Sequence, residues 1–308
     1  MKLKINLLLI LAIVSASVYG QQRKKKGKKA AVPTETVAPP PVEPPKPEMP
    51  AVNPMSMMLD SMAREDSAVV ASGYDPLSVR KVHKSDVMYR MTIWRTLDLR
   101  EKCNQPFFAK DNQITKAIID EVLAGRLIPY AKDSLNRILP IQDFKDKVID
   151  PTSAQVDAEG NPIPGTGVPF MANQLYVIKF KENLLFDKQR SRFYYDVQTL
   201  TLYVPAEYNT LKGTETEVAS FKYKDLVEVF KNMPTAKWYN SQNRAEDKKI
   251  SDAMDLRLFC SRIIKMSNPK DAMIEDMPEY NTSDKTILIA SQKYEYELVA
   301  KENEVWDY

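Results

Sequence analysis

The chain has 308 residues, of which 44% are hydrophobic, and its formal net charge is only +3. This length allows one large domain or two smaller ones, and the part that follows residue 75 is close to neutral. A domain without net positive charge is poorly suited to binding along a phosphate backbone, which depends on clustered positive charge, so we expect no nucleic-acid partner.

The first twenty residues have the three parts of a secretory signal peptide. Lys2 and Lys4 precede an apolar run over 5–14, and small side chains at Val18 and Gly20 suit signal peptidase. A membrane anchor is the alternative, but the run is shorter than the ~20 residues of a membrane span. We expect cleavage after Gly20, a soluble mature protein without a transmembrane anchor, and no lipidated cysteine.

Residues 21–74 have the composition of a disordered basic and proline-rich linker. Six of the seven residues 23–29 are Lys or Arg, and nine prolines lie between Pro33 and Pro54. The basic run is either a solvated arm or a tether to anionic lipid headgroups or an acidic partner. Residues 55–62 are apolar enough to dock on another surface or to form a short surface helix.

Residues 75–210 are predicted to form a first α+β half. Apolar residues recur every three or four positions after Ser85, which predicts a capped helix over 85–97. A second helix is predicted from Asn112 to Gly125, where a left-handed residue would end it. Strands are predicted over 175–180 and over 193–204, with residues 186–191 as a charged hairpin loop between them.

Residues 211–308 are predicted to repeat this order as a second half. Helices are expected near 226–230 and 250–259, and strands over 286–290 and 294–300. Sliding the chain by 136 residues aligns 114–128 with 250–264, with identical Ile, Ala, Arg and Ile at four positions. The expected fold class is therefore α+β, with two sequence-related halves of helices followed by antiparallel strands. One shared amphipathic pattern is the alternative explanation.

The two cysteines, Cys103 and Cys260, would lie in an oxidising compartment after export, where a disulfide can persist. Geometry decides whether they pair, and the sequence does not supply it. We expect two separate buried thiols, with a disulfide as the alternative.

No arrangement of residues that would indicate catalysis is recognisable. The chain lacks a GxSxG elbow, a Walker loop and GxGxxG, and its single histidine, His83, stands in a polar segment typical of the surface. The carboxylates mostly alternate with Lys and Arg, and no pair stands out for glycosidase chemistry. We expect no catalytic, metal or cofactor site. The alternative is an exported hydrolase whose acids are not identifiable.

Some motifs have the residue types of binding surfaces instead. Residues 93–102 combine a tryptophan and two arginines with acids, and Trp and Arg are enriched at binding hot spots. A core tryptophan on an element decorated with ion pairs is the alternative. Residues 238–243 and 267–269 are polar and turn-like, suited to capping backbone groups or to contacting a neighbour.

Several motifs in a fixed order resemble the GldN (PorN) family of the type IX secretion and gliding apparatus of Bacteroidetes. The resemblance covers about residues 80–275 and rests on Asp86-Val-Met88, Ile93-Trp-Arg95, Asp98-Leu-Arg-Glu-Lys102, Asn104, Lys181-Glu182, Phe186-Asp-Lys-Gln-Arg-Ser191, Tyr239-Asn240, Asn243, Leu258-Phe259, Ser261, Ile264-Lys265, Ser267-Asn268 and Asp271. The segments 184–185 and 200–205 depart from the family pattern, which suggests a divergent member or paralogue.

The resemblance implies a non-enzymatic periplasmic ring subunit. Its partners would be a GldK/PorK-like outer-membrane lipoprotein, a GldM/PorM-like motor protein and further copies of itself, and its location would be peripheral to the outer membrane. Candidate interface residues are Trp94, Arg95, Asp98, Arg100, Glu101, Lys102, Asp187, Lys188, Arg190, Tyr239, Asn240, Asn243, Arg262, Lys265 and Asn268. The family also implies O-glycosylation, for which Ser61, Ser67 and Ser134 fit the motif. A chaperone or cargo-binding module is a third possible function.

Overall fold

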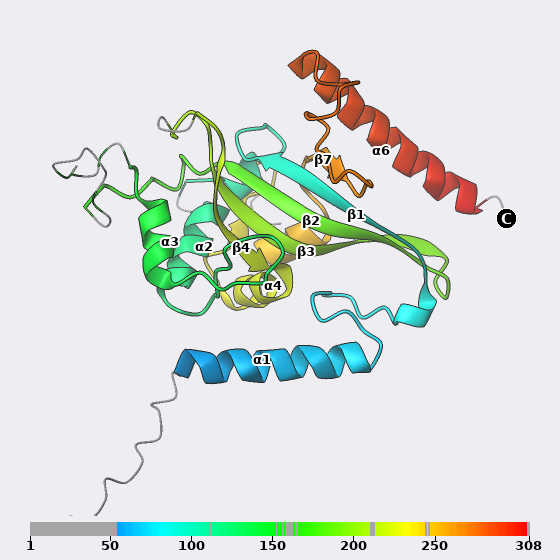
Figure 1. The fold of residues 1–308 in the computed structure, drawn as a ribbon, viewed down its shortest axis with the longest axis horizontal. Helices are drawn as coiled ribbons and strands as arrows, with labels where there is room; N and C mark the ends of the chain where they lie inside the picture. Colours follow the sequence, from blue (N-terminus) through cyan, green and yellow to red (C-terminus); the bar gives the residue numbers. More distant parts are fainter. Residues whose placement is uncertain are drawn as a thin grey trace, which may run out of the picture. The chain divides into compact units, whose positions relative to one another are not determined.

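The computed structural model describes residues 54–306 except 111, 152, 154, 156, 158–162, 164–165, 210–212, 244 and 246. The predicted signal peptide and most of the predicted linker therefore lie outside the described residues. The α+β class is confirmed: a five-stranded antiparallel sheet carries several helices (Figure 1). The strand order is β4 (Thr216–Lys222), β3 (Arg192–Val204), β2 (Val177–Asp187), β1 (Val87–Asp98) and β7 (Arg262–Met266).

The helix predicted over 85–97 is wrong, because most of this segment is strand β1. Ile93, Arg95 and Leu97 are buried and alternate with partly exposed Trp94 and Thr96, which is the period-two pattern of a strand. An arginine at one of the inward positions hides that alternation. The Val, Tyr, Thr, Ile and Trp side chains of the segment also favour a strand over a helix. Before β1, the short 3-10 helix η1 (Lys84–Asp86) is capped by His83 and not by Ser85.

The two mid-chain strands are confirmed as β2 and β3, which form a long antiparallel hairpin. The turn between them lies within the loop that was predicted over 186–191, and Ser191 takes a left-handed conformation with φ 50°. The pairing runs from Val177 opposite Tyr203 to Asp187 opposite Arg192. This hairpin is the central feature of the sheet, because β1 pairs along the outer side of β2 for almost its full length.

The helix predicted from residue 112 is confirmed as α2 (Ile114–Leu123), and Gly125 after it has φ 74° as expected. The helix predicted near 226–230 is α4 (Tyr223–Asn232). The helix predicted over 250–259 is shorter, α5 (Ile250–Asp255). The remaining short elements are η2 (Gln105–Phe107), α3 (Ile141–Val148), and the paired strands β5 (Lys237–Trp238) and β6 (Lys248–Lys249).

The main hydrophobic core lies between the sheet and the helices α2, α3, α4 and α5. Ile178, Phe180 and Leu200 come from the sheet, and Ile118 and Phe230 come from the helices, all of them essentially inaccessible to water. Burial of each such side chain contributes about 1.5–3 kcal/mol. Strands from both predicted halves line this core.

The two closing strands predicted over 286–290 and 294–300 are wrong, because both segments belong to one helix, α6 (Asp284–Trp306). Its inward side chains Ile287, Ala290, Tyr294 and Leu298 follow a spacing of three or four residues and pack in a second, smaller core with Ile93 of β1. The aromatic and β-branched residues suggest a strand locally, but Ser283 accepts a hydrogen bond from the backbone N–H of Thr286 and starts a helix.

The predicted linker of residues 21–74 ends in helix α1 (Pro54–Ala71), so its last part is helical. The boundary predicted between the halves at 210/211 is crossed by the sheet, since β4 and β7 lie beyond it and β1, β2 and β3 before it. The two segments aligned by the internal repeat both begin as helices. They then differ, because α5 ends at Asp255 and the chain enters β7 at Arg262, whereas α2 continues to Leu123, the position aligned with Phe259. The duplication stays a prediction.

Candidate interaction surface

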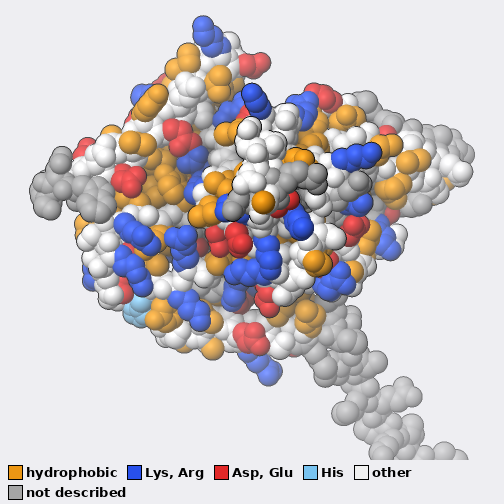
Figure 2. Space-filling model, turned by 180° about the vertical axis from the view of Figure 1, so that it is seen from behind, with side chains coloured by type: hydrophobic (Ala, Val, Ile, Leu, Met, Phe, Trp, Pro, Cys, Tyr) orange, Lys and Arg blue, Asp and Glu red, His pale blue; other side chains and the backbone are white. Residues whose placement is uncertain are grey.

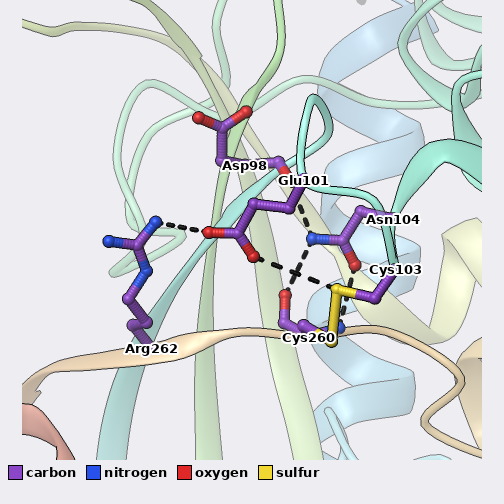
Figure 3. Close-up of a disulfide and its surroundings, with 6 residues drawn as sticks. All are labelled: Asp98, Glu101, Cys103, Asn104, Cys260 and Arg262. Atoms are coloured by element: carbon purple, nitrogen blue, oxygen red, sulfur yellow. Dashed lines mark hydrogen bonds and ion pairs between the residues drawn. A yellow bond between two sulfur atoms is a disulfide. The ribbon is translucent and has the colours of Figure 1, made fainter.

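Cys103 and Cys260 form a disulfide, with Cα atoms 6.0 Å apart and a sequence separation of 157 (Figure 3). Our expectation of two separate buried thiols is wrong, and both residues are exposed. Cys103 lies in the turn that follows β1, and Cys260 lies just before β7, the strand that pairs with β1. The antiparallel pairing of β1 and β7 brings these two ends together, which the sequence separation conceals.

Asn104 joins the same two segments through hydrogen bonds. Its Nδ2 donates to the carbonyl oxygens of Asp98 at 2.8 Å and Cys260 at 2.9 Å, and its Oδ1 accepts from the backbone N–H of Cys260 at 2.8 Å. The residue is fully buried. Because every polar group of this amide is used, the turn after β1 is held firmly against the chain before β7.

Charged side chains surround the disulfide on the outside. Arg100 donates to Asp98 at 2.9 Å and lies 3.6 Å above the ring centroid of Tyr176. The hydrogen bond that Arg100 donates to Asp98 is the main cause that raises the pKa of Arg100 above its usual value. Figure 3 shows Glu101 between the guanidinium of Arg262, with which it forms an ion pair, and the sulfur of Cys103.

We call this region the disulfide corner and define it by Arg100, Glu101, Lys102, Cys103, Cys260 and Arg262. Arg100, Lys102 and Arg262 are exposed, and the backbone that carries them is cross-linked. A rigid, exposed set of charges loses little conformational entropy when a partner binds. The corner therefore has the properties of an interaction surface.

Arg95 occupies a different environment, inside the protein. Its Nε donates to Glu182 of β2 at 2.5 Å and its Nη2 donates to Glu295 of α6 at 3.0 Å, while Arg257 donates to the same Glu182 at 2.7 Å. Burial opposes its charged form, but the hydrogen bond and charge of Glu295 and the charge of Glu182 together raise the pKa of Arg95. These four residues form a charge cluster that attaches α6 to the sheet. The sequence motif contained Glu182, but no sequence signal pointed to Arg257 or Glu295.

Trp94 and Lys265 lie side by side on the sheet. The Lys265 ammonium is 4.4 Å from the Trp94 ring centroid, and the indole N–H donates to Asp133 at 3.0 Å. Lys265 is largely buried and forms an ion pair with Asp271 at 2.6 Å. This arrangement is a cation–π contact between neighbouring strands, and it stabilises the register of β1 against β7.

Several other candidate interface residues shape turns. Asp187 accepts hydrogen bonds from the backbone N–H and the side chain of Arg190, at 3.4 and 2.8 Å. Burial favours the neutral form of Asp187, but these hydrogen bonds and one from the backbone N–H of Gln189 outweigh it and lower the pKa of Asp187. The Asn240 side chain accepts from the backbone N–H groups of Gln242 and Asn243. The side chain of Asn243 accepts a hydrogen bond from the backbone N–H of Ala245, and the side chain of Asn268 binds three backbone groups of its own loop. The backbone N–H of Tyr239 donates to the carbonyl of Pro106.

The structure therefore separates the candidate residues into two groups. Arg95, Asp187, Asn240 and Asn268 hold the fold together, whereas the exposed charges collect in two places. One is the disulfide corner, and the other is the β2–β3 turn with Lys188 and Arg190. Ser61, Ser67 and Ser134 are also exposed, and their glycosylation stays a prediction.

His83 has a structural role in the described structure. Its Nδ1 accepts from the backbone N–H of Ser85 at 3.2 Å, and its ring packs edge-on against Tyr74. Within the described part of the chain, no three His, Cys, Asp or Glu side chains are grouped so as to hold a metal ion. Among the described helices, none is both long and apolar enough to cross a membrane.

Comparison with known protein families gives one result that covers most of the chain. Residues 82–307 match the family of the gliding motility associated protein GldN. None of the curated proteins compared with the sequence is a match. The family match spans every element from η1 to α6, including the disulfide corner, the charge cluster and the β2–β3 turn. The chain belongs to the GldN family of gliding motility associated proteins.

Proposed function

We propose that this chain is a non-enzymatic structural subunit of the periplasmic ring of the type IX secretion and gliding machinery. In this role it is required for export of proteins across the outer membrane. The observation that carries the proposal is the family match over residues 82–307, which includes the whole sheet and its helices.

Two further observations support a periplasmic location. The first twenty residues have the pattern of a signal peptide. The exposed disulfide between Cys103 and Cys260 suits an oxidising compartment, since such bonds are rare in proteins that stay in the cytosol. The chain would be peripheral to the outer membrane and held there by a lipidated partner.

The partners we propose are a GldK/PorK-like outer-membrane lipoprotein, a GldM/PorM-like motor protein and further copies of the chain. The disulfide corner is our candidate surface for the lipoprotein. It presents Arg100, Lys102 and Arg262 on a backbone held by both the disulfide and Asn104. Pre-organised charges of this kind favour specific and fast association.

Co-expression with the GldK/PorK-like lipoprotein tests this function. We expect the two proteins to co-purify and negative-stain microscopy to show large rings. Single particles of the chain without bound lipoprotein, or hydrolysis of a glycoside by the purified chain, would contradict it.

The binding surface has its own test in the same system. Changing Arg100→Glu together with Lys102→Glu should lower lipoprotein capture about tenfold, because each reversal replaces attraction by repulsion at a rim of the contact. Lys145→Glu together with Lys285→Glu is the matched control, since both lysines are exposed and lie on α3 and α6. Equal capture by the two variants would exclude the disulfide corner as the lipoprotein site and leave the ring function standing.

A further inference from the structure

The β2–β3 turn lies against the segment that precedes β1, and together they form a basic surface. The backbone N–H of Lys188 donates to the carbonyl of Asp86 at 2.9 Å. The guanidinium carbons of Arg80 and Arg192 lie 5.2 and 4.6 Å from the centroid of the same Tyr194 ring. We call residues 80–86 and 187–192 the basic hairpin end.

Positive charge at the basic hairpin end is largely unpaired. It contains six cations, which are Arg80, Lys81, Lys84, Lys188, Arg190 and Arg192, and two carboxylates, Asp86 and Asp187. All six cations are exposed, and among the described residues only Arg190 forms an ion pair, with Asp187 at 2.8 Å. Figure 2 shows Lys and Arg side chains gathered at the left of that view, near the pale-blue histidine. A surface of this kind attracts a partner of opposite charge.

A groove of opposite character lies between α1, α2 and α4. Its volume of about 890 Å³ is within the range of pockets that enclose other molecules. Four carboxylates line it, from Asp120, Glu121, Asp225 and Glu228. Among the described residues of its lining there is one arginine, Arg126, and it is already paired with Glu121 at 2.5 Å. We call this the acidic groove.

Apolar side chains between the carboxylates make the acidic groove more than a group of charges. Met58, Met62 and Met233 line it together with Val229 and Ile128. Methionine side chains are unbranched and adapt to the shape of what they contact. The groove therefore offers apolar contact area as well as charge, which is the composition of a protein-binding surface.

The two surfaces share no residue, and they approach each other at one place, where Lys81 and Glu228 line the same pocket beside α1 and α4. The β2–β3 turn belongs to a different part of the fold from the groove. In Figure 1, the β2–β3 turn lies at the right, and the groove helices α2 and α4 lie at the left with the beginning of α1. A copy of the chain can therefore use both surfaces at once. Contact between two unlike surfaces of identical subunits is head-to-tail, and such contacts close into rings when the rotation between neighbours allows it.

We propose that the basic hairpin end of one copy docks in the acidic groove of the next copy. The proposal rests on the proposed ring function and names the surfaces through which neighbouring subunits meet. The charges of the two surfaces identify the hairpin end of another copy as the occupant of the groove. Contact between two hairpin ends would bring unpaired cations together, whereas contact between a hairpin end and a groove pairs opposite charges. The turn is well shaped for insertion, because Asp187 binds the backbone N–H groups of Gln189 and Arg190 and so holds it rigid.

Charge reversal tests the contact. One variant carries Lys84→Glu and Lys188→Glu, and another carries Asp120→Lys and Glu228→Lys. Lys81 is left unchanged, because it lines a pocket together with Glu228 of its own chain. All four changed residues are exposed, and none takes part in an ion pair among the described residues, so folding should be retained. When it is co-expressed with the lipoprotein, each variant alone should give at least about tenfold less protein that sediments as large assemblies. The variant with all four changes should regain the large assemblies, because opposite charges again face each other.

A matched control carries Lys145→Glu and Lys285→Glu, which changes the net charge as much as the hairpin variant does at exposed positions elsewhere. It should assemble like the unchanged protein. Near-ultraviolet circular dichroism and the melting temperature confirm that each variant is folded. Unchanged assembly of both single-surface variants, or failure of the combined variant to recover, would overturn the proposed contact.

The outcome is distinguishable from failure of the ring function itself. If the unchanged protein forms large assemblies with the lipoprotein and the reversals have no effect, the contact is wrong and the ring function stands. If the unchanged protein stays monomeric with the lipoprotein, the ring function fails first.

A second measurement places the two surfaces next to each other. A chain with Lys188→Cys and Glu228→Cys should form a ladder of covalent oligomers under mild oxidation within assembled material. Chains with only one of the two changes should form no ladder, because a head-to-tail contact brings position 188 of one copy to position 228 of the next. Dimers of the Lys188→Cys chain, with no ladder from the double variant, would show a like-with-like contact and contradict the proposal.

Discussion

Asn104 binds backbone groups of two segments that lie far apart in sequence. Its side chain makes three hydrogen bonds: it donates to the carbonyls of Asp98 and Cys260, and it accepts from the backbone N–H of Cys260. A buried polar group that loses its partner costs about 1–3 kcal/mol. Asn104 is therefore a structural residue next to a candidate binding surface, and its place in a family motif follows from folding as much as from function.

Replacing this side chain should show its contribution to folding. Asn104→Ala is expected to lower the free energy of unfolding by about 2–4 kcal/mol, because the buried backbone groups of Asp98 and Cys260 lose their partner. Urea denaturation under oxidising conditions measures this. Asn281→Ala is the control, since Asn281 is exposed, and it should change stability by less than about 0.5 kcal/mol. Equal midpoints for both variants would contradict the assigned role.

Asp196 gives the fold a dependence on pH. Burial raises the pKa of Asp196 to about 6, with the charge of Asp75 adding to the rise and hydrogen bonds from Ser78 and Val79 opposing it. An unfolded aspartate titrates near 4. The folded protein therefore holds this proton more tightly, so the group's contribution to stability is fully present below about pH 4. It is lost as pH rises through about 6.

Between pH 4 and pH 7.5 the unchanged protein should lose about 2–3 kcal/mol of stability relative to Asp196→Asn, since two units of pKa correspond to about 2.7 kcal/mol. Paired urea titrations at several pH values measure the difference. The exposed Asp276→Asn serves as the control and should give parallel curves. A constant difference between the unchanged protein and Asp196→Asn over this range would show that Asp196 titrates normally.

Helix α6 shows at the scale of elements how a buried charge attaches a helix to a sheet. The side chain of Arg95 is only 5% exposed, and it is shared between Glu182 of β2 and Glu295 of α6. The apolar core under α6 is small. The ion pair with Glu295 is therefore a major part of what holds the helix, and the loss of one partner of a buried charge is costly.

Hydrogen exchange tests this attachment. Glu295→Ala should lower the protection of residues 284–306 about tenfold or more, because Arg95 keeps only Glu182 as its carboxylate on that side. Glu297→Ala removes a carboxylate from the same helix that faces Lys293 at 4.0 Å on the surface, and it should leave protection nearly unchanged. Similar exchange in both variants would mean that the apolar contacts alone hold α6.

The disulfide links the turn after β1 to the chain before β7. Closing a loop of this length stabilises a protein by about 3–5 kcal/mol in the chain-entropy model. The double variant Cys103→Ser and Cys260→Ser should lose that amount in urea denaturation. The unchanged protein with reductant should behave like this variant. Identical unfolding midpoints with and without reductant would show that the disulfide contributes nothing to stability.

At the scale of the whole molecule, the predicted halves share one sheet. Leu200 and Leu202 of β3 pair with Phe221 and Ala219 of β4, which lies in the second half, and β1 pairs with β7. A chain that ends at residue 210 exposes both of these edges and lacks the core side chains that β4, α4 and α5 contribute. Such edges are templates for aggregation.

A fragment test follows from this arrangement. Residues 75–210 alone, with Cys103→Ser to prevent dimers, should show no cooperative unfolding and should aggregate. The fragment 53–308 retains the complete sheet and should unfold cooperatively. Cooperative unfolding of the shorter fragment would support two independent halves.

The sequence predicted correctly those elements whose pattern is local and unambiguous. The helix before Gly125 and the strands on either side of the charged turn follow from short-range periodicity and turn chemistry. The prediction from sequence failed at residues 87–98 and 284–306. In the first segment an inward arginine hides the alternation of a strand, and in the second the clustered aromatic residues suggest a strand although the segment is a helix. In both cases the packing partner decided the conformation, and tertiary contacts outweigh differences in propensity of a few tenths of a kcal/mol per residue.

The sequence by itself determined the α+β class, the GldN family and which residue types make up the candidate surfaces. Only the tertiary structure decided the role of each residue, because burial and ion pairing depend on neighbours that are distant in sequence. Arg95 and Arg100 stand five positions apart in one motif, yet one is buried between Glu182 and Glu295 and the other is exposed beside the disulfide. The disulfide and the contrast between the basic hairpin end and the acidic groove likewise exist only once the strands have paired.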